Sequence, residues 1–404
     1  MEKIFNPAIR NRVVVVLTNN DGVICSVCPI GRDLGIPKFE PYFKVKHLLD
    51  KHNAVVFSSN YELYQFLSDS MMNILARFAQ NTYVYSIDEA FSEFDNYSKV
   101  ISNYYDYGHK MRRAVWREIR LPIGVGISST LTLAKAANHA SKKLPGADGV
   151  ALIDNEESRK HILSQMKLSD VWGIGRRLNV HLSQMGIKNA WELSTQSPKK
   201  MRKFLSVNVE RTVNELNGVP CLSWDDVRAE KKEIYSTRSL GQRITNQYAL
   251  LNAFANHVDI VCNKSFNQKT LIKSLVVFAS NSPFDDQYYK KSIKIEFNSP
   301  TLNRSKILNG ISDNIAQLFD TSIAYYRVGV GAVDLKSTKF IQYDFFSDME
   351  DSTLTNCYQN INQRFGKGMI RMGTQIGHEH HKMKRLMLSP RYNTRWSDIP
   401  VIKC

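Results

Sequence analysis

The sequence predicts an α/β protein of several domains, and three observations on its 404 residues support that fold class. Strand-like and helix-like segments alternate over residues 1–150, and an all-helical pattern fills residues 160–220. From about Glu233 the order is strand, helix, strand, strand, helix, strand. One hydrophobic core rarely organises a chain of this length, so we expect helices layered on more than one sheet.

The amino-acid composition narrows the class of protein further. With 43% hydrophobic and 23% charged residues, the chain has the composition of a folded globular protein. No apolar run approaches the ~20 residues that cross a bilayer, and the opening MEKIFNPAIRNR lacks the apolar stretch of a secretory signal. We therefore expect a cytoplasmic protein without a membrane partner. The six cysteines are scattered and form no disulfide framework.

The net charge of +16 is unevenly placed along the chain. Residues 1–90 contain nine basic and nine acidic residues, so the whole excess lies in the later parts. This pattern suits a protein whose later domains bind a polyanion while the first domain carries out chemistry. A solvated basic surface without a partner is the alternative.

The alternating first part opens with RVVVVL at residues 12–17, a β-branched run typical of a strand buried on both faces of a sheet. A turn signal follows at residues 18–22. The further predicted strands are 54–57, 82–87 and 123–127, and the predicted helices are 61–78, 109–120 and 131–143. Ser128, Ser129 and Thr130 offer N-caps for the last of these helices.

The helical part contains two short helices joined through Gly173-Ile174-Gly175, which predicts a helix-hairpin-helix. In such a motif the glycines let the backbone approach a phosphate, and N–H groups at a helix N-terminus donate to it. The alternative is a C-capping glycine between two core helices. A second Gly-Ile step at Gly186-Ile187 favours the DNA-binding interpretation.

The last large part has the β-α-β-β-α-β order. Its predicted strands are 234–244, 271–279, 291–297 and 326–335, and its predicted helices are 247–266 and 303–319. Apolar and polar residues alternate in the third strand, which predicts one face packed on helices and one polar face that meets a nucleic-acid backbone or water. Beyond residue 345 the periodicity is weak, so we expect a basic extension with limited structure of its own.

The sharpest chemical feature is the doublet Asp88-Glu89 in YSIDEAF. Two carboxylates at the end of an apolar strand are costly to bury unless a cation or hydrogen-bond donors compensate them. They can serve one metal only where the strand turns or ends. Hard oxygens of this kind suit Mg²⁺ in phosphoryl chemistry, although an Asp-Glu pair alone is more often a solvated turn.

In its context the doublet resembles the catalytic motif of the Y-family, translesion DNA polymerases. The segments that carry the resemblance cover almost the whole chain: VVVLTNNDG, LGIP, PYFK, SSNYELY, SIDEAF, GVGISSTLTLAKAANHASK, VWGIGRRL, SVNVERTVNELNGVPC and YSTRSLGQRIT. The C-terminal KMKRLMLSPRYNTRWSDIP is similar to the UmuC branch of that family, the catalytic subunit of DNA polymerase V.

The resemblance implies a right-hand polymerase and a division into domains. The expected domains are palm at 1–19 and 54–160, fingers at 20–53, thumb with helix-hairpin-helix at 161–232, little finger at 233–340, and a clamp-binding motif with basic tail at 341–404. The implied function is error-prone translesion synthesis on damaged template DNA in SOS-type repair. The implied partners are primer-template DNA, deoxynucleotide triphosphates, a sliding clamp, a processed UmuD-type dimer and RecA filaments.

The resemblance also implies roles for single residues. Asp88 and Glu89 look like two members of the metal-binding carboxylate set for two Mg²⁺ ions, with Glu89 near the primer 3′ oxygen. Lys142 resembles the lysine that neutralises the triphosphate, and Arg32 falls where fingers residues contact phosphates, although the preceding ICSVCPIG departs from the family pattern. The residues expected to hold DNA are Gly173, Gly175, Lys273, Lys290 and Lys294. The three lysines are equally well explained as ordinary surface lysines.

A short segment at Gln342-Tyr343-Asp344-Phe345-Phe346 has the composition of a clamp-binding peptide. In such a peptide the glutamine fixes the register and two aromatic rings fill an apolar pocket. The two phenylalanines could instead pack on the chain's own core. The position matches the family's clamp motif, so we expect Gln342, Phe345 and Phe346 to bind a sliding clamp.

The sequence departs from the family pattern at its start. Family members begin with a strand that bears a metal-binding aspartate and then an aromatic pair that excludes ribonucleotides, whereas MEKIFNP aligns just after that motif. The resemblance therefore implies that a carboxylate, the sugar gate and one palm strand are missing, and that this chain polymerises poorly. A start codon upstream of Met1 is the favoured explanation. An N-terminally truncated, inactive DNA- and clamp-binding protein is the alternative, and a structural nucleic-acid-binding protein is a third.

Overall fold

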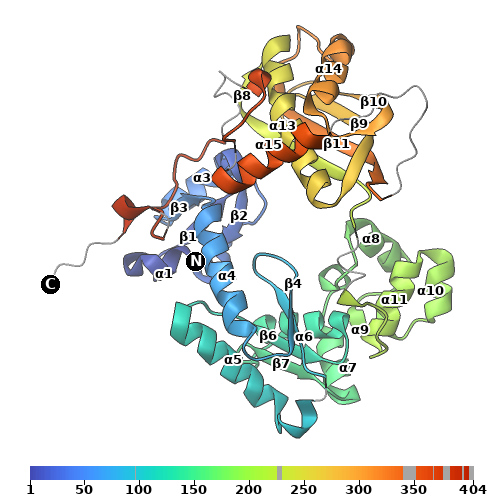
Figure 1. The fold of residues 1–404 in the computed structure, drawn as a ribbon. Coiled ribbons are helices and arrows are strands. Elements are labelled where there is room, and N and C mark those ends of the chain that lie inside the picture. The colour runs from blue at the N-terminus through green and yellow to red at the C-terminus, as the bar shows by residue number, and fades with distance from the viewer. Residues whose placement is uncertain are drawn as a thin grey trace. The chain divides into compact units, whose positions relative to one another are not determined.

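The structure is a computed structural model, and it describes residues 1–95, 97–224, 230–339, 352–366, 368–375, 383–393 and 395–399. The chain divides into two compact units, whose elements are labelled in Figure 1. Unit 1 contains Met1–Arg10, Asn60–Ala229 and Ser389–Cys404, and unit 2 contains Asn11–Ser59 and Glu230–Leu388. Each unit therefore joins segments that are far apart in the sequence.

The first part of unit 1 packs helices on two separate pairs of strands. Strand β4 (Asn81–Val84) pairs antiparallel with β5 (Ala90–Glu93), and β6 (Val125–Ser128) pairs parallel with β7 (Val150–Ile153). The accompanying helices are α1 (Glu2–Phe5), η1 (Pro7–Ile9), α4 (Tyr61–Leu75), η3 (Tyr97–Lys99), α5 (Tyr104–Ile119) and α6 (Leu131–Lys143). The buried core of this part lies between α4 and α5 and includes Met71, Met111 and Val115.

Local sequence explains where α4 and α6 begin and how α6 packs. The Asn60 side chain accepts a hydrogen bond from the Leu63 backbone N–H at 3.2 Å, and Thr130 accepts one from Leu133 at 3.2 Å, which confirms Thr130 as the predicted N-cap. Gly126 on β6 lies against α6, and a Cβ at this position would overlap the helix backbone at Asn138. Glycine is therefore required for the close approach of β6 and α6.

The second part of unit 1 is all helical, as predicted for residues 160–220. Its helices are α7 (Glu156–Gln165), η4 (Leu168–Asp170), α8 (Arg176–Gln184), α9 (Ala190–Ser194), α10 (Pro198–Phe204) and α11 (Val207–Leu216). They share a core in which Leu163, Leu182, Leu193, Met201 and Leu216 are fully buried.

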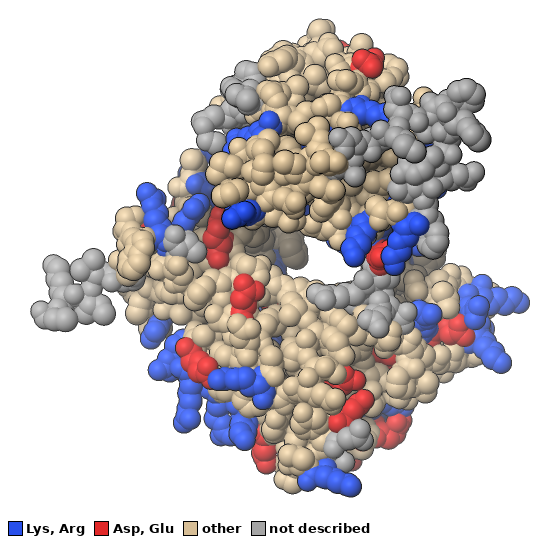
Figure 2. Space-filling model, in the orientation of Figure 1, with Lys and Arg blue, Asp and Glu red and all other residues tan. Residues whose placement is uncertain are grey.

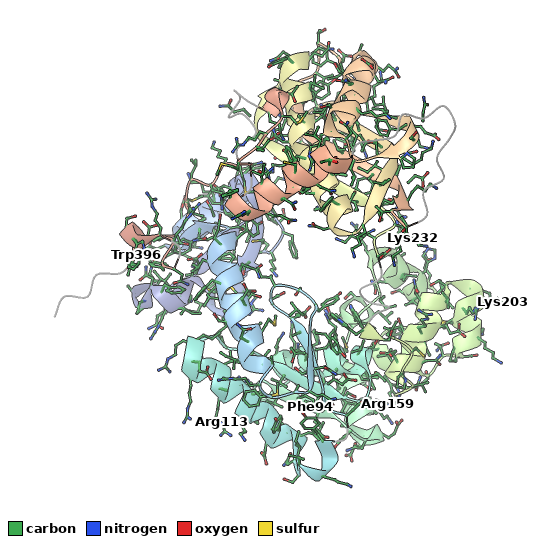
Figure 3. All side chains as sticks on the ribbon, viewed as in Figure 1. Phe94, Arg113, Arg159, Lys203, Lys232 and Trp396 are labelled. Carbon is green, nitrogen blue, oxygen red and sulfur yellow. The ribbon has the colours of Figure 1, made fainter. Side chains whose placement is uncertain are left out.

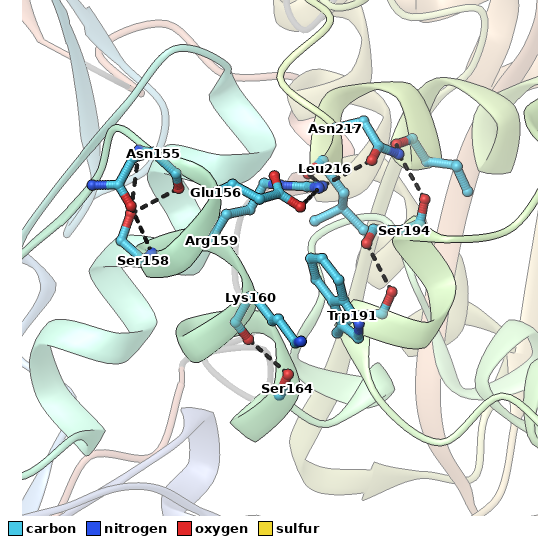
Figure 4. Close-up of polar contacts among 11 residues, drawn as sticks. Asn155, Glu156, Ser158, Arg159, Lys160, Ser164, Trp191, Ser194, Leu216 and Asn217 are labelled. Atoms are coloured by element: carbon cyan, nitrogen blue, oxygen red, sulfur yellow. Dashed lines mark hydrogen bonds and ion pairs between the residues drawn. The ribbon is translucent and has the colours of Figure 1, made fainter.

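Arg159 on α7 ties three of these helices together (Figure 4). Its guanidinium pairs with Glu156 at 2.7 Å, donates to the Leu216 carbonyl at 2.9 Å, and lies over the Trp191 ring at 4.9 Å. Asn217 accepts a further bond from Arg159 at 2.8 Å and donates to the carbonyl of Ser194 at 2.7 Å. One cation thus joins α7, α9 and the end of α11.

Unit 2 contains a small three-stranded sheet with the order β2-β1-β3. Strand β1 (Val14–Leu17) pairs antiparallel with β2 (Ile24–Val27) and parallel with β3 (Val55–Ser58). The accompanying helices are η2 (Asn19–Asp21), α2 (Pro29–Asp33) and α3 (Tyr42–Lys51). The neighbouring residues Val14 and Val15 of β1 are 6% and 0% exposed, which confirms the prediction of a strand buried on both faces. The sheet joins β1 and β3, which lie in the expected palm, to β2, which lies in the expected fingers.

The larger domain of unit 2 has the predicted β-α-β-β-α-β order. Its elements are β8 (Ile234–Ile244), α13 (Gln247–Asn267), β9 (Thr270–Ser280), β10 (Lys290–Thr301), α14 (Arg304–Asn314), η5 (Ile315–Gln317) and β11 (Tyr325–Ser337). All strand pairs are antiparallel, in the order β10-β9-β11-β8. On β10, Ile295 and Phe297 are buried whereas Lys294 and Glu296 are exposed, which confirms the predicted alternation.

The prediction of limited structure beyond residue 345 was wrong for the described part of that region. Helix α15 (Ser352–Phe365) is 14 residues long, and η6 (Gly373–Gln375) and η8 (Trp396–Asp398) follow. One of the buried contacts of α15 is polar: Gln359 is only 4% exposed and bonds to Asn263 of α13.

Basic side chains gather along one face of α5, at the lower left of Figure 2. Lys110, Arg113, Arg117 and Arg120 are all exposed, and Arg113 is labelled in Figure 3. Within the described ranges no helix is long and apolar enough to span a membrane.

Candidate active site

The doublet Asp88-Glu89 lies in the tight connection between β4 and β5 of unit 1. The expected strand 82–87 ends early, at Val84, because the backbone N–H groups of Tyr85 and Ser86 both donate to the Glu89 carbonyl, at 3.0 and 3.1 Å. The chain therefore turns at the doublet, which is the condition under which neighbouring carboxylates can serve one cation.

The two carboxylates have different surroundings. Asp88 is exposed and accepts a hydrogen bond from the Ser86 hydroxyl at 2.6 Å. Glu89 forms an ion pair with Lys135 of α6, with 3.0 Å between Oε2 and Nζ, and the side chains of the pair are 32% and 21% exposed. A basic partner inside the protein thus already holds Glu89, which the sequence analysis did not foresee.

Lys135 also lies between two aromatic rings. Its Nζ is 4.7 Å from the centre of the Tyr85 ring and 5.5 Å from that of Trp172. Trp172 belongs to the predicted helix-hairpin-helix and donates from Nε1 to the Tyr85 hydroxyl at 3.1 Å. The ring of Phe91 lies 5.9 Å from that of Trp172. Lys135, Tyr85 and Trp172 therefore join the helix-hairpin-helix directly to the turn that bears the doublet.

Asp88 and Glu89 are the two carboxylates that the turn offers to a cation. Mg²⁺ is usually bound by one or two carboxylates together with water and substrate phosphates. In the part of the chain that the structure describes, there is no group of three or more His, Cys, Asp or Glu side chains that could hold a metal ion. A site for two ions needs further donors.

A cavity of about 140 Å³ separates the doublet's strand from β6. Ala90, Phe91 and Ser92 of β5 line one part of it, and residues 123–128 line another. Within the described ranges β5 pairs with β4 alone and β6 with β7 alone, so the strands around the doublet form two separate pairs. Asn138 of α6 also lines the cavity, and its buried Oδ1 has no hydrogen-bond partner.

The two expected phosphate-binding cations lie in different units. Lys142 is exposed in the last turn of α6, seven residues after Lys135, and its side chain lies over Gly124 just before β6. Arg32 is exposed on the short helix α2 of unit 2. Lys142 is thus on the same helix as the cation that holds Glu89.

In the segment predicted as a helix-hairpin-helix, the two glycines of the Gly-Ile-Gly turn have different backbone conformations. Gly173 is exposed with φ +90°, a conformation that a side chain would disfavour, and Gly175 is the N-cap of α8. The first two residues of α8, Arg176 and Arg177, are exposed. Sequence reasoning assigned no role to these two arginines, although they directly follow Gly175.

The three expected DNA-binding lysines of unit 2 have different surroundings. Lys273 donates to the carbonyls of Phe297 and Asn298 on β10, at 2.7 and 3.0 Å, so its charge is used within the sheet. Lys290 and Lys294 are exposed on β10, and Lys294 lies 3.9 Å from Glu296. The expected clamp-binding residues Gln342, Phe345 and Phe346 lie outside the described residues.

Family models match three parts of the chain. The model described as the impB/mucB/samB family matches residues 1–139, and that of its C-terminal domain matches residues 231–345. A domain of unknown function, DUF4113, matches residues 352–402.

Curated relatives match over the full length. The chain is 35% identical to the protein UmuC of Salmonella typhimurium, over 100% of this chain and 97% of the relative. It is 33% identical to the protein MucB of the same species, over 99% of this chain and 96% of the relative. It is 21% identical to DNA polymerase IV 1 of Bacillus subtilis, over 95% of this chain and 92% of the relative.

Solved structures share the fold. A Y-family DNA polymerase chimera, Dbh-Dpo4(243-245)-Dbh, superposes with a TM-score of 0.64 at 18% identity, over 82% of this chain and 94% of the other. An insertion ternary complex of Dbh DNA polymerase gives a TM-score of 0.51 over 83% and 95%. The chain therefore belongs to the impB/mucB/samB family, is of the UmuC type, and has the fold of the Y-family DNA polymerases.

Proposed function

We propose that this protein is a template-directed DNA polymerase that inserts nucleotides opposite damaged template bases. The observation that carries the proposal is the Asp88-Glu89 turn, joined through Tyr85 and Trp172 to a helix-hairpin-helix, in a chain whose relatives include a DNA polymerase IV. The turn supplies carboxylates for nucleotidyl transfer, and the hairpin supplies backbone N–H groups for a DNA phosphate.

We further propose for the site residues the roles that the family resemblance implies. Asp88 and Glu89 would hold Mg²⁺, which supplies charge neutralisation for the triphosphate and an activated primer oxygen. Lys142 is exposed at the end of α6 and neutralises phosphate charge, and Arg32 does so from α2. Gly173 and Gly175 present the backbone of the hairpin to DNA.

We also propose that Lys290 and Lys294 contact DNA phosphates, because both are exposed on the polar face of β10. We further propose the partners that the family resemblance implies: a sliding clamp bound by Gln342, Phe345 and Phe346, a processed UmuD-type dimer and RecA filaments. In this proposal the protein acts in the cytoplasm as part of an SOS response.

A second function, DNA binding without catalysis, has one observation in its favour. The described residues place only two carboxylates at the turn, and Lys135 already neutralises one of them. A chain with this donor set binds one Mg²⁺ ion, and in-line phosphoryl transfer with two ions is then slow.

Primer extension by the purified 404-residue chain tests both functions. The substrates are a primer-template with an abasic site and an undamaged one, with Mg²⁺ and all four deoxynucleotide triphosphates. We expect slow Mg²⁺-dependent insertion opposite the abasic site, at least 100-fold slower again in Asp88→Asn and unchanged in Asp69→Asn, which alters an exposed carboxylate of α4. Tight DNA binding with no extension by either the parent chain or Asp88→Asn would refute the polymerase and support the DNA-binding protein.

A further inference from the structure

The region matched by the domain of unknown function makes specific contacts within unit 2. Residues 383–388 are called here the C-terminal strap. The backbone N–H of Lys384 donates to Oδ1 of Asn20 at 2.9 Å, and that of Leu386 donates to Oδ2 of Asp21 at 2.9 Å. The turn after β1 therefore binds backbone N–H groups of the strap, and the Met387 side chain packs on the core of the same sheet.

Ser58, at the end of β3, completes the binding site for the strap. Its hydroxyl donates to Oδ1 of Asp21 at 2.6 Å and accepts from the Met387 N–H at 3.0 Å, and its own N–H donates to the Met387 carbonyl at 2.9 Å. A parallel bridge joins Ser58 to Leu388. Ser58 is fully buried, and β3 is an edge strand, so the strap covers an edge of the β2-β1-β3 sheet that would otherwise be open.

The turn has an unusual backbone that matches this role. Asn20 and Asp21 both have positive φ, 60° and 51°, a region that residues other than glycine rarely adopt and that persists when the surroundings hold it in place. The other end of the Asn20 amide, Nδ2, donates to the Ser239 carbonyl of β8 at 2.6 Å. A single side chain thus links the strap, the turn and the larger sheet of unit 2.

The described part of the same region that precedes the strap is bound to the larger domain. Arg304 of α14 is 5% exposed, pairs with Asp259 of α13 at 2.7 Å and lies over the Tyr358 ring of α15 at 4.1 Å. Further along, Gln375 donates to the Ala255 carbonyl of α13 at 3.3 Å. The C-terminal region is therefore held both on the larger domain and on the β2-β1-β3 sheet.

We propose that the described residues 352–366, 368–375 and 383–388 form an intramolecular brace, with the Asn20-Asp21 turn and Ser58 as its receptor, that holds the β2-β1-β3 sheet on the larger domain of unit 2. The brace gives a role to the segment matched by the domain of unknown function. It depends on hydrogen bonds within this chain and not on the proposed polymerase activity.

Hydrogen–deuterium exchange of the full chain, read by mass spectrometry, tests the brace. Asn20→Gly and Asp21→Gly keep a residue that accepts positive φ while removing the acceptor side chains. Lys269→Gly is the matched control, because Lys269 also has positive φ, 57°, and an exposed side chain. We expect the amides of residues 384–388 to exchange about tenfold faster in both variants and at the parent rate in the control.

Unchanged exchange of residues 384–388 in a folded Asp21→Gly protein would overturn the proposal. Exchange that accelerates evenly over unit 2 would also overturn it, because the turn would then support the fold in general. Ser58→Ala provides a milder check, since it removes the hydroxyl that bonds Asp21 and Met387 but keeps the backbone pairing. We expect about threefold faster exchange confined to residues 384–388, and no change there would count against the brace.

Discussion

Replacement of Lys135 by glutamine removes the cation that holds Glu89. The pair has 3.0 Å between Nζ and Oε2 and is partly exposed, so we take its net contribution as about 1 kcal/mol. We infer that a divalent cation competes with Lys135 for Glu89. Removing this competitor should therefore raise the affinity of the doublet for Mn²⁺ by about fivefold, since 1.4 kcal/mol corresponds to tenfold.

Electron paramagnetic resonance of free Mn²⁺ measures this affinity on the full chain without DNA or nucleotide. Lys143→Gln is the matched control, because Lys143 is exposed on the same helix and the change in net charge is identical. We expect Lys143→Gln to bind Mn²⁺ with the parent affinity. An unchanged affinity in Lys135→Gln, or an equal rise in both variants, would refute direct competition for Glu89.

Two further predictions concern stability. Glu215 is fully buried, and its carboxylate accepts hydrogen bonds from the backbone N–H groups of Thr132, Cys221 and Leu222. Glu215→Ala should therefore lower the free energy of unfolding by about 2–4 kcal/mol, as measured by urea titration. A loss below about 1 kcal/mol would contradict this role. Burial lowers the pKa of His139 despite the opposing effect of the Asp170 carboxylate, so the native state disfavours the charged imidazole. The free energy of unfolding should therefore fall as the pH drops from about 7.5 through the lowered pKa of His139. His139→Gln should make the melting temperature less dependent on pH over that range. An equally steep dependence in this variant would refute His139 as the cause.

Two elements of the larger domain were predicted close to their observed bounds. The predicted strand 234–244 has the same bounds as β8, and the predicted helix 247–266 differs by one residue from α13, which begins directly after its N-cap Asn246. Helix α5 instead begins at Tyr104 and not at residue 109, because the side chain of Asn103 caps it by accepting from two backbone N–H groups. That cap was not recognised in the sequence.

Contacts between distant residues could not be predicted from the sequence. Asp88 and Glu89 were found through their motif, but Lys135, the partner of Glu89, lies 46 residues further along the chain on α6. The contact of the strap with Asn20 spans 364 residues and uses backbone donors, which leave no pattern in the sequence. The roles of the individual site residues remain predictions.

Iron-mediated cleavage tests most directly whether the Asp88-Glu89 turn holds a divalent cation. Fe²⁺ bound in place of Mg²⁺, with ascorbate and oxygen, cuts the backbone next to the ion, and mass spectrometry locates the cut. We expect cleavage within residues 86–91 that excess Mg²⁺ suppresses and Asp88→Asn abolishes, whereas Asp69→Asn leaves it unchanged. Cleavage confined to other parts of the chain, or cleavage at the turn that survives Asp88→Asn, would contradict the assignment of this turn as the metal site.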